Sequence, residues 1–153
     1  MMDSDIVSSV ALATILEQLP LKVLVGDAGY TRITEIAIDS RRVQPGNLFV
    51  ALKGETADGH DFILDAIRKG AAAVVGDQAL SNLGVPYVQV ENSRMALPWL
   101  AAAFHGFPGR NLTVVGITGT DGKTTTCNLL YQILLAAGLK TGLISSVHSI
   151  IGV

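Results

Sequence analysis

The feature that most constrains this chain is a short glycine-containing segment that ends in a lysine and two threonines, Gly119-Thr120-Asp121-Gly122-Lys123-Thr124-Thr125. It follows the apolar run Leu112–Ile117, which is typical of a buried parallel strand, and it opens a helix predicted from Lys123 to about Ala137. A strand, a glycine loop and a helix in this order direct backbone N–H groups and a helix N-terminus at one point. This arrangement predicts binding of nucleotide phosphates.

The residue types in the loop have separate chemical reasons. Glycine at two positions lets the backbone approach a phosphate without a side chain in between. Lys123, the catalytic candidate, would reach the β- and γ-phosphates as a cation, and Thr124 stands where a P-loop hydroxyl ligates Mg²⁺. We therefore expect ATP and Mg²⁺ as cofactors, with ATP contacts from Gly119, Thr120, Asp121, Gly122, Lys123, Thr124 and Thr125.

Two residues depart from the general phosphate-loop pattern. Ile117 stands where the pattern G-x-x-x-x-G-K-[ST] has its first glycine. Asp121 places an acid beside the phosphates, and we expect it to face solvent and to cap the helix that starts at Lys123. The alternative is a glycine-rich turn with an incidental lysine. Three β-branched threonines in a first helical turn argue against that alternative, because their helix propensity is weak.

Alternating strands and helices in the rest of the chain predict an α/β layer arrangement. A glycine- and proline-containing break at Gly106–Gly109 is the expected domain boundary, which gives a small α/β domain at 1–106 and a second domain at 110–153. The second would begin a parallel-sheet ATPase domain with one βαβ unit, whose second strand starts at Leu143-Ile144. In the first domain we expect helices at Ile6–Leu19, Phe62–Lys69 (capped by Asp61 and ended by Gly70) and Ser93–His105, and strands at Ile33–Ile38, Leu48–Leu52, Ala72–Val75 and Pro86–Val90.

Composition excludes several classes of protein. The net charge is -2 and the 11 Lys and Arg residues are scattered, so we expect no nucleic-acid partner. No apolar stretch approaches the roughly 20 residues of a membrane span. The acidic start Met1–Asp5 is unlike a signal peptide, and the single cysteine, Cys127, excludes an intramolecular disulfide and is expected to be buried on a helix. These features predict a cytoplasmic protein.

Several motifs resemble those of the Mur ligases. The segment Val115–Thr126 is similar to the ATP loop of that family, T-G-T-N-G-K-T-T, which also lacks the first glycine of the general pattern. Upstream, Asp39–Ala51 looks like the family's N-terminal signature, and Ala57–Ile63 continues it. Phe104–Pro108 with Leu112 resembles the linker of the members that add the third peptide residue. The resemblance covers nearly the whole chain.

The resemblance implies an ATP-dependent amide ligase of peptidoglycan precursor synthesis that is a monomer at full length. Such an enzyme joins diaminopimelate or lysine to UDP-N-acetylmuramoyl-L-alanyl-D-glutamate through an acyl-phosphate. The resemblance also implies that the first domain holds the UDP part of this substrate, with contacts at Ile38, Ser40, Glu55, Thr56 and Ala57.

Simpler roles compete with these assignments. Ser40 could be a hydroxyl that caps a turn, and Glu55 an exposed loop acid. For Asp58, His60 and Asp61, capping and turn roles are favoured over a metal site or acid–base chemistry.

Three other functions remain open at this point. The segment Leu48–Glu55 also suits the family member that adds the D-Ala-D-Ala dipeptide. A folate polyglutamate or cyanophycin synthetase would share the ATP domain, but Asp39–Phe62 resembles a UDP-substrate domain. A non-catalytic remnant that binds only the UDP-substrate is the third. Because the family's carbamylated lysine, further magnesium ligands and C-terminal domain have no counterpart here, we expect a fragment that does not ligate alone.

Overall fold

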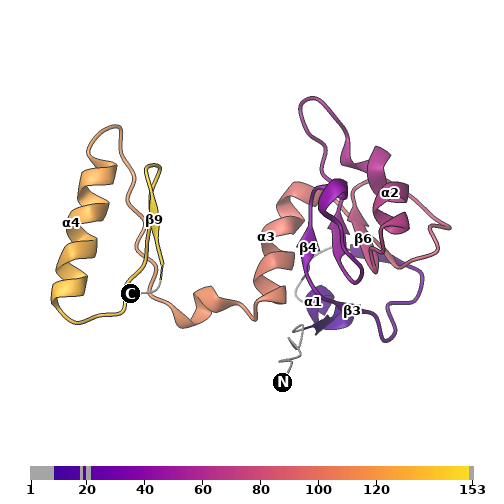
Figure 1. Ribbon diagram of the computed structural model, residues 1–153, viewed down its shortest axis with the longest axis horizontal. Coiled ribbons are helices and arrows are strands. Elements are labelled where there is room, and N and C mark those ends of the chain that lie inside the picture. Colours follow the sequence, from indigo (N-terminus) through magenta and orange to yellow (C-terminus); the bar gives the residue numbers. More distant parts are fainter. Residues whose placement is uncertain (1–8, 18, 20–21, 152–153) are drawn as a thin grey trace, which may run out of the picture. The chain divides into compact units, whose positions relative to one another are not determined.

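The computed structural model describes residues 9–17, 19 and 22–151 (Figure 1). The chain divides into two compact units, Met1–Asn111 (unit 1) and Leu112–Val153 (unit 2), and each is described by itself. None of the described helices is long and apolar enough to cross a membrane. The first residues of the helix predicted at Ile6–Leu19 lie outside the described residues.

Unit 1 is built on a five-stranded sheet with the strand order β2-β7-β6-β5-β4. Four strands run parallel, and β2 at the end of the sheet is antiparallel to β7. A separate antiparallel pair joins β1 to β3. The α/β fold class predicted from the sequence is therefore confirmed. The strands of unit 1 span Val10–Ala11 (β1), Lys22–Val25 (β2), Arg32–Ile33 (β3), Ile36–Ala37 (β4), Leu48–Val50 (β5), Ala73–Gly76 (β6) and Tyr87–Val90 (β7).

Side chains of the central strands alternate between two buried clusters. In β5, Leu48 and Val50 belong to the first cluster, whereas Phe49 belongs to the second. Helices α1 (Leu12–Glu17) and α3 (Ser93–Phe104) cover the first cluster, and α2 (Ile63–Arg68) covers the second. The sheet is thus covered on both faces, which is the usual condition for parallel strands.

In the first 40 residues, two sequence-based element boundaries were wrong and one strand was missed. The chain changes partner between β3, which pairs with β1, and β4, which pairs with β5, so the single strand expected at Ile33–Ile38 is two short strands. The helix expected from Ile6 begins only at Leu12, because Val10 and Ala11 pair with β3. Strand β2 was not predicted, although a β-branched run that ends at Gly26 is a strand signal.

The remaining helices of unit 1 lie close to the predicted positions. A 3₁₀ helix, η2 (Gly59–Phe62), precedes α2, and its cap is the carboxylate of Asp58, which accepts a hydrogen bond from the His60 backbone N–H at 3.0 Å. The N-cap residue of α2 is Phe62, which makes no side-chain hydrogen bond, so the expected cap at Asp61 was wrong. Gly70, with a φ of 99°, follows the end of α2 as predicted. Two more 3₁₀ helices are η1 (Ser40–Arg42) and η3 (Pro108–Asn111).

Unit 2 contains the helix α4 (Lys123–Ala136) and an antiparallel hairpin of β8 (Leu143–Ile144) and β9 (Ser149–Ile150). The predicted helix and the predicted start of the strand at Leu143 are confirmed, but β8 pairs antiparallel with β9, so the predicted parallel βαβ unit is not formed by the described residues. The strand expected at Leu112–Ile117 is absent, because this segment pairs with no strand among the described residues. A parallel strand requires a hydrogen-bonded neighbour. Cys127 lies on α4 as predicted but is only partly buried.

Candidate functional site

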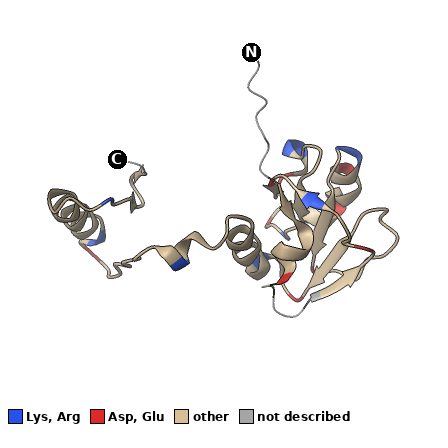
Figure 2. Ribbon diagram, turned by 90° about the horizontal axis from the view of Figure 1, so that it is seen from below, with Lys and Arg blue, Asp and Glu red and all other residues tan. Residues whose placement is uncertain are grey.

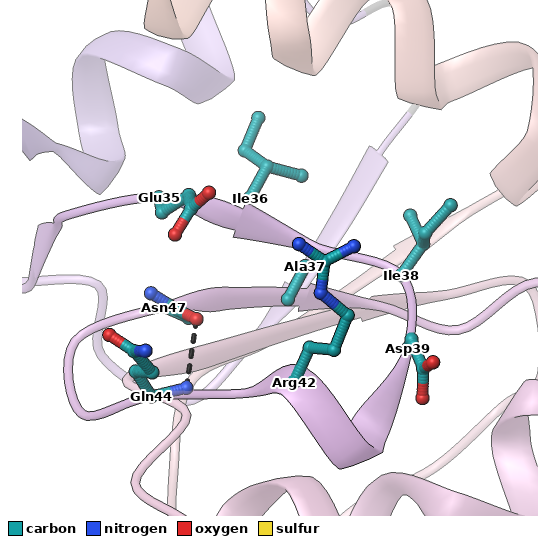
Figure 3. Close-up of a pocket in the computed structure, with 8 residues that line it drawn as sticks. All are labelled: Glu35, Ile36, Ala37, Ile38, Asp39, Arg42, Gln44 and Asn47. Carbon is teal, nitrogen blue, oxygen red and sulfur yellow. Dashed lines mark hydrogen bonds between the residues drawn. The ribbon is translucent and has the colours of Figure 1, made fainter.

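A cavity of about 330 Å³ lies beside β4, at the end of the five-stranded sheet (Figure 3). Of the five residues expected to contact the UDP-substrate, only Ile38 lines this cavity. Its side chain is exposed, and it directly follows β4. The residues that line the cavity are Glu35, Ile36, Ala37, Ile38, Asp39, Arg42, Gln44 and Asn47.

The backbone of β4 can also offer hydrogen-bonding groups to a ligand in this cavity. The carbonyl of Glu35 accepts a hydrogen bond from the Leu48 N–H at 2.8 Å, so the backbone polar groups of Glu35 face β5. Because successive residues of a strand turn their backbone polar groups to opposite sides, the N–H and C=O groups of Ile36 face away from β5. Ile38 follows the end of β4 and lies in a bend. No described strand pairs with the side of β4 that faces away from β5. An edge of this kind can pair with another planar donor and acceptor set.

The 3₁₀ helix η1 fixes the residues that follow β4. Asp39 accepts hydrogen bonds from the Arg41 backbone N–H at 3.0 Å and from the Arg41 guanidinium Nη2 at 2.8 Å. The side-chain hydrogen bond with Arg41 is the largest cause that lowers the pKa of Asp39 to about 2. Asp39 rather than Ser40 therefore caps this turn. Ser40 is buried, and its carbonyl accepts a hydrogen bond from Lys69 Nζ at 3.0 Å.

Arg42 is the cationic side chain of the cavity. Figure 3 shows it extending from η1 with its guanidinium toward the β4 side of the cavity. Its guanidinium has no hydrogen-bond or ion-pair partner among the described residues, although its charge helps to lower the pKa of Asp39. Over unit 1 as a whole, basic and acidic residues are interspersed (Figure 2). An arginine with free donors in a cavity is suited to a phosphate or diphosphate.

The other predicted substrate residues, Glu55, Thr56 and Ala57, form an exposed turn after β5. The Gly54 N–H donates to the Ala57 carbonyl at 2.9 Å, and an isolated bridge joins Lys53 to Asp58. The strands β4 and β5 are parallel neighbours, so their carboxyl ends lie at the same edge of the sheet. Ser40 and this turn follow those two ends, which is the usual position of ligand sites in open α/β sheets.

Asp58 and His60 have the structural roles that the sequence favoured. Asp58 caps η2 and contacts His60 Nδ1 at 2.6 Å, and these contacts lower its pKa. Asp61 is exposed. No group of three or more His, Cys, Asp or Glu side chains in the described part of the chain could hold a metal ion.

The phosphate loop of unit 2 has two glycines in the left-handed region of backbone space. Gly119 has a φ of 149° and Gly122 a φ of 75°, a conformation that side chains disfavour. The ammonium group of Lys123 donates hydrogen bonds to the carbonyls of Gly119 and Thr120, so the lysine side chain folds back onto the loop that precedes it. These contacts hold the ammonium group against the backbone of the loop.

The start of α4 leaves further donors for an anion. The Thr126 N–H donates to the Gly122 carbonyl at 2.9 Å, the first hydrogen bond of the helix. The N–H groups of the three preceding residues, Lys123–Thr125, therefore have no partner within the helix. The free N–H groups and the Lys123 ammonium group form a donor set that suits phosphates. The two glycines keep side chains out of the way of these donors.

Asp121 is exposed, as expected, but it does not cap α4. The N-cap residue is Gly122, which makes no side-chain hydrogen bond. The left-handed conformation of Gly122 turns the chain directly into the helix, so the cap position falls one residue after Asp121. Thr124, the expected Mg²⁺ ligand, is partly buried, and Thr125 is exposed.

Comparison with known proteins gives the same family from sequence and from structure. Residues 32–105 match the model described as the Mur ligase family, catalytic domain. A UDP-N-acetylmuramoyl-L-alanyl-D-glutamate–2,6-diaminopimelate ligase of Geobacillus kaustophilus is 48% identical over 92% of this chain. The chain spans 28% of the length of that relative.

Solved structures support the same relationship. The MurF ligase of Thermotoga maritima in complex with ADP superposes with a TM-score of 0.53 at 40% identity, over 67% of this chain and 23% of that one. A UDP-N-acetylmuramoyl-L-alanyl-D-glutamate–2,6-diaminopimelate ligase has a TM-score of 0.64 over 93% of this chain and 28% of that one. At 21% identity this second similarity shows the fold alone. The matched family model and the identity to a relative across both units show that the chain belongs to the Mur ligase family.

Proposed function

We propose that the chain is part of an ATP-dependent ligase that adds the third amino acid of the peptidoglycan precursor. The observation that carries this proposal is the 48% identity to a diaminopimelate ligase over 92% of the chain, which spans both the cavity and the phosphate loop. The substrate would be UDP-N-acetylmuramoyl-L-alanyl-D-glutamate. The relative's name favours diaminopimelate over lysine as the amino acid.

In this proposal unit 1 binds the UDP part of the substrate. The backbone N–H and C=O groups of Ile38, which lines the cavity directly after β4, would pair with the imide edge of uracil, which offers the complementary acceptor and donor. Ser40 and the turn of Glu55, Thr56 and Ala57 would contact the ribose and diphosphate, with the turn contributing backbone groups. Arg42, which has free guanidinium donors, would neutralise the diphosphate.

Unit 2 would bind ATP through the loop from Gly119 to Thr125. Lys123 would exchange the carbonyls of Gly119 and Thr120 for β- and γ-phosphate oxygens, which are stronger acceptors for an ammonium group. Thr124 would supply a hydroxyl ligand to Mg²⁺. The metal ion, when bound, would neutralise charge on the transferred phosphoryl group. Asp121, which is exposed, would remain outside these contacts.

The reaction is an amide ligation in two steps. The D-glutamyl carboxylate attacks the γ-phosphorus of ATP to give an acyl-phosphate and ADP, and the amine then displaces phosphate to form the amide. The contribution of this chain is to position the two substrates and to stabilise charge through Lys123. We propose that the part of the enzyme represented here does not ligate without the rest of the catalytic machinery.

A second candidate is the ligase that adds the D-Ala-D-Ala dipeptide. The similarity to MurF structures, at 32% and 40% identity, favours it. The higher identity to the diaminopimelate ligase, 48%, leads us to place it second. A UDP-binding remnant without ATP binding is the third candidate, and calorimetry distinguishes it from both ligases.

The test is calorimetric titration of the chain with UDP-N-acetylmuramoyl-L-alanyl-D-glutamate and, separately, with Mg-ATP. We expect the UDP-substrate to bind and Mg-ATP to bind more weakly, with no ligation. Arg42→Ala should weaken UDP-substrate binding about tenfold, because a charge-assisted contact is lost. The matched control is Arg68→Ala, an exposed arginine on α2 outside the cavity, which should leave the affinity unchanged.

Each result of this titration has a defined meaning. UDP-substrate binding without any Mg-ATP binding would favour the remnant. Absence of UDP-substrate binding would contradict the assignment of unit 1. In a separate assay with the UDP-substrate, Mg-ATP and diaminopimelate together, ligase turnover by the chain alone would overturn the proposal that it is inactive.

A further inference from the structure

The segment Asp58-Gly59-His60 follows the exposed turn, and the proposed function assigns it no role. The His60 side chain is only 2% exposed. Its Nδ1 lies 2.6 Å from Asp58 Oδ1, and its Nε2 accepts the backbone N–H of Asp77 at 3.1 Å. His60 Nε2 also lies 3.3 Å from Asp77 Oδ1, so both ring nitrogens have polar partners.

Further hydrogen bonds connect this histidine to the segment after β6 and to the start of α3. Asp58 Oδ2 accepts a hydrogen bond from Gln78 Nε2 at 3.2 Å. Asp77, which follows β6, accepts from the Ser93 backbone N–H at the start of α3 at 3.3 Å. The network therefore joins the residue at the end of the exposed turn to both β6 and α3.

Two glycines make room for this network. A Cβ at Gly59 would lie 2.6 Å from the Leu52 backbone nitrogen, and a Cβ at Gly76 would lie 2.8 Å from His60 Nε2. Both distances are shorter than real Cβ contacts. Gly59 and Gly76 thus allow the close approach that seats His60 between Asp58 and Asp77.

The turn itself has few contacts of its own. Within it, the Gly54 N–H to Ala57 carbonyl hydrogen bond closes a tight turn, and its side chains are exposed. Its two ends are held from outside: Arg94 of α3 donates to the Lys53 carbonyl at 2.8 Å, and the His60 network holds Asp58. The direction in which the turn presents its backbone groups is therefore set at these ends.

We propose that His60 is a positioning residue for the turn Lys53–Asp58, with Arg94 as the second anchor. This inference rests on the proposed function, in which Glu55–Ala57 contact the UDP-substrate. His60 does not touch the substrate. It holds the carboxylate of Asp58, and through it one end of the turn, in the orientation that binding requires.

The experiment combines amide hydrogen exchange with calorimetry. The probe is UDP-N-acetylmuramoyl-L-alanyl-D-glutamate, and the variants are His60→Leu, His60→Asn and Arg94→Ala, each measured where it is folded. Leucine removes both ring nitrogens but keeps apolar volume, and asparagine keeps a donor near Nδ1. Arg94 is exposed, so its substitution tests the second anchor with little risk to the fold. Arg68→Ala is the control.

We expect His60→Leu to speed exchange of the turn amides and to weaken UDP-substrate binding, each about tenfold or more. His60→Asn should recover part of both losses, and Arg94→Ala should show the same pattern with a smaller change. Affinity for Mg-ATP should not change in any variant. A role limited to stability would instead change exchange across the whole of unit 1.

The inference is overturned if the turn amides exchange at the wild-type rate in folded His60→Leu, or if its affinity stays within about twofold of wild type. Failure of the wild-type chain to bind the UDP-substrate is a different result. It would reject the proposed function, whereas the exchange rates would still decide whether His60 and Arg94 anchor the turn.

Discussion

The two units differ in how their local structure is supported. Unit 1 buries strand side chains in two clusters, with Leu48, Val50, Val75 and Val88 fully inaccessible. In the described part of unit 2, the only buried hydrophobic side chains are Tyr131 and Leu143. Apolar residues of unit 2 that stay exposed include Leu112, Val114, Val115, Leu129, Ile133, Leu139, Ile144, Val147 and Ile151.

The two candidate sites therefore form by different means. The phosphate loop is held by glycine φ angles and by hydrogen bonds between residues at most four apart, such as Thr126 Oγ1 to the Gly122 carbonyl. The cavity and the turn of unit 1 depend on contacts between segments far apart in sequence, such as Arg94 to Lys53. Unit 1 should therefore respond to core and packing changes that unit 2 tolerates.

The largest contrast is expected from truncation of apolar side chains. Phe49→Ala in unit 1 removes a side chain that is 1% exposed, and it should lower the free energy of unfolding by about 3–5 kcal/mol. Ile133→Ala in unit 2 shortens a side chain that is 56% exposed, and it should change the free energy by about 0.5 kcal/mol or less. Urea unfolding followed by circular dichroism measures both. Equal losses would contradict the comparison.

Substitution of glycines by alanine should give the next largest contrast. Gly59→Ala places a Cβ 2.6 Å from the Leu52 backbone nitrogen, and it should cost about 1–3 kcal/mol. Gly116→Ala in unit 2 meets no atom within 4 Å and should stabilise by at most about 1 kcal/mol, through the unfolded state. Thermal unfolding of the two variants checks the signs. A neutral Gly59→Ala would show that the approach of Gly59 to Leu52 is not required.

A pH titration tests the burial of unit 1 at Tyr87. Burial and the nearby charge of Asp77 raise the pKa of this phenol to about 12, from its ordinary 10.0. Below pH 10 the phenol is neutral in both states, so its contribution to stability is complete. Between pH 10 and about 12 the unfolded chain ionises first, so stability falls as pH rises. The difference in tyrosinate absorbance between wild type and Tyr87→Phe measures this titration. Ionisation of Tyr87 at pH 10 would contradict its burial.

The smallest effect is expected at the exposed acid of the phosphate loop. Asp121→Asn removes a negative charge near the start of α4, and it should strengthen Mg-ATP binding by about two- to fivefold. The UDP-substrate should bind the variant and the wild type equally. Calorimetry at two salt concentrations checks the electrostatic origin, because added salt should reduce the gain. Weaker ATP binding would show that Asp121 contributes to the site.

The sequence was most informative where structure is local. The helix from Lys123, its end at Gly138 and the glycine conformations of the loop follow from residues close together in the chain. Pairing between distant segments was harder to predict from the sequence, as the division of Ile33–Ile38 between two sheets shows. A run such as Leu112–Ile117 has the composition of a strand, but composition does not provide the neighbour with which a strand must pair.

In the candidate site, too, local features were predicted from the sequence and contacts between distant residues were not. Ile38, a predicted substrate contact, lines the cavity, and Asp58 caps a turn as favoured. The free guanidinium of Arg42 was missed because its neighbour Arg41 has the same type of side chain, and only the structure shows which of the two pairs with Asp39. The anchoring role of His60 depends on Asp77, which is 17 residues away in sequence. No sequence pattern joins those two residues.

The most direct test of this account is to map the two ligands on the isotope-labelled 16.0 kDa chain by amide NMR. UDP-N-acetylmuramoyl-L-alanyl-D-glutamate should shift the amides of Ile38, Ser40 and Thr56 in unit 1. Mg-ATP should shift those of Gly119 and Gly122 in unit 2. A UDP-substrate that perturbs only unit 2, or leaves the amides beside β4 and the turn unchanged at saturation, would contradict the account.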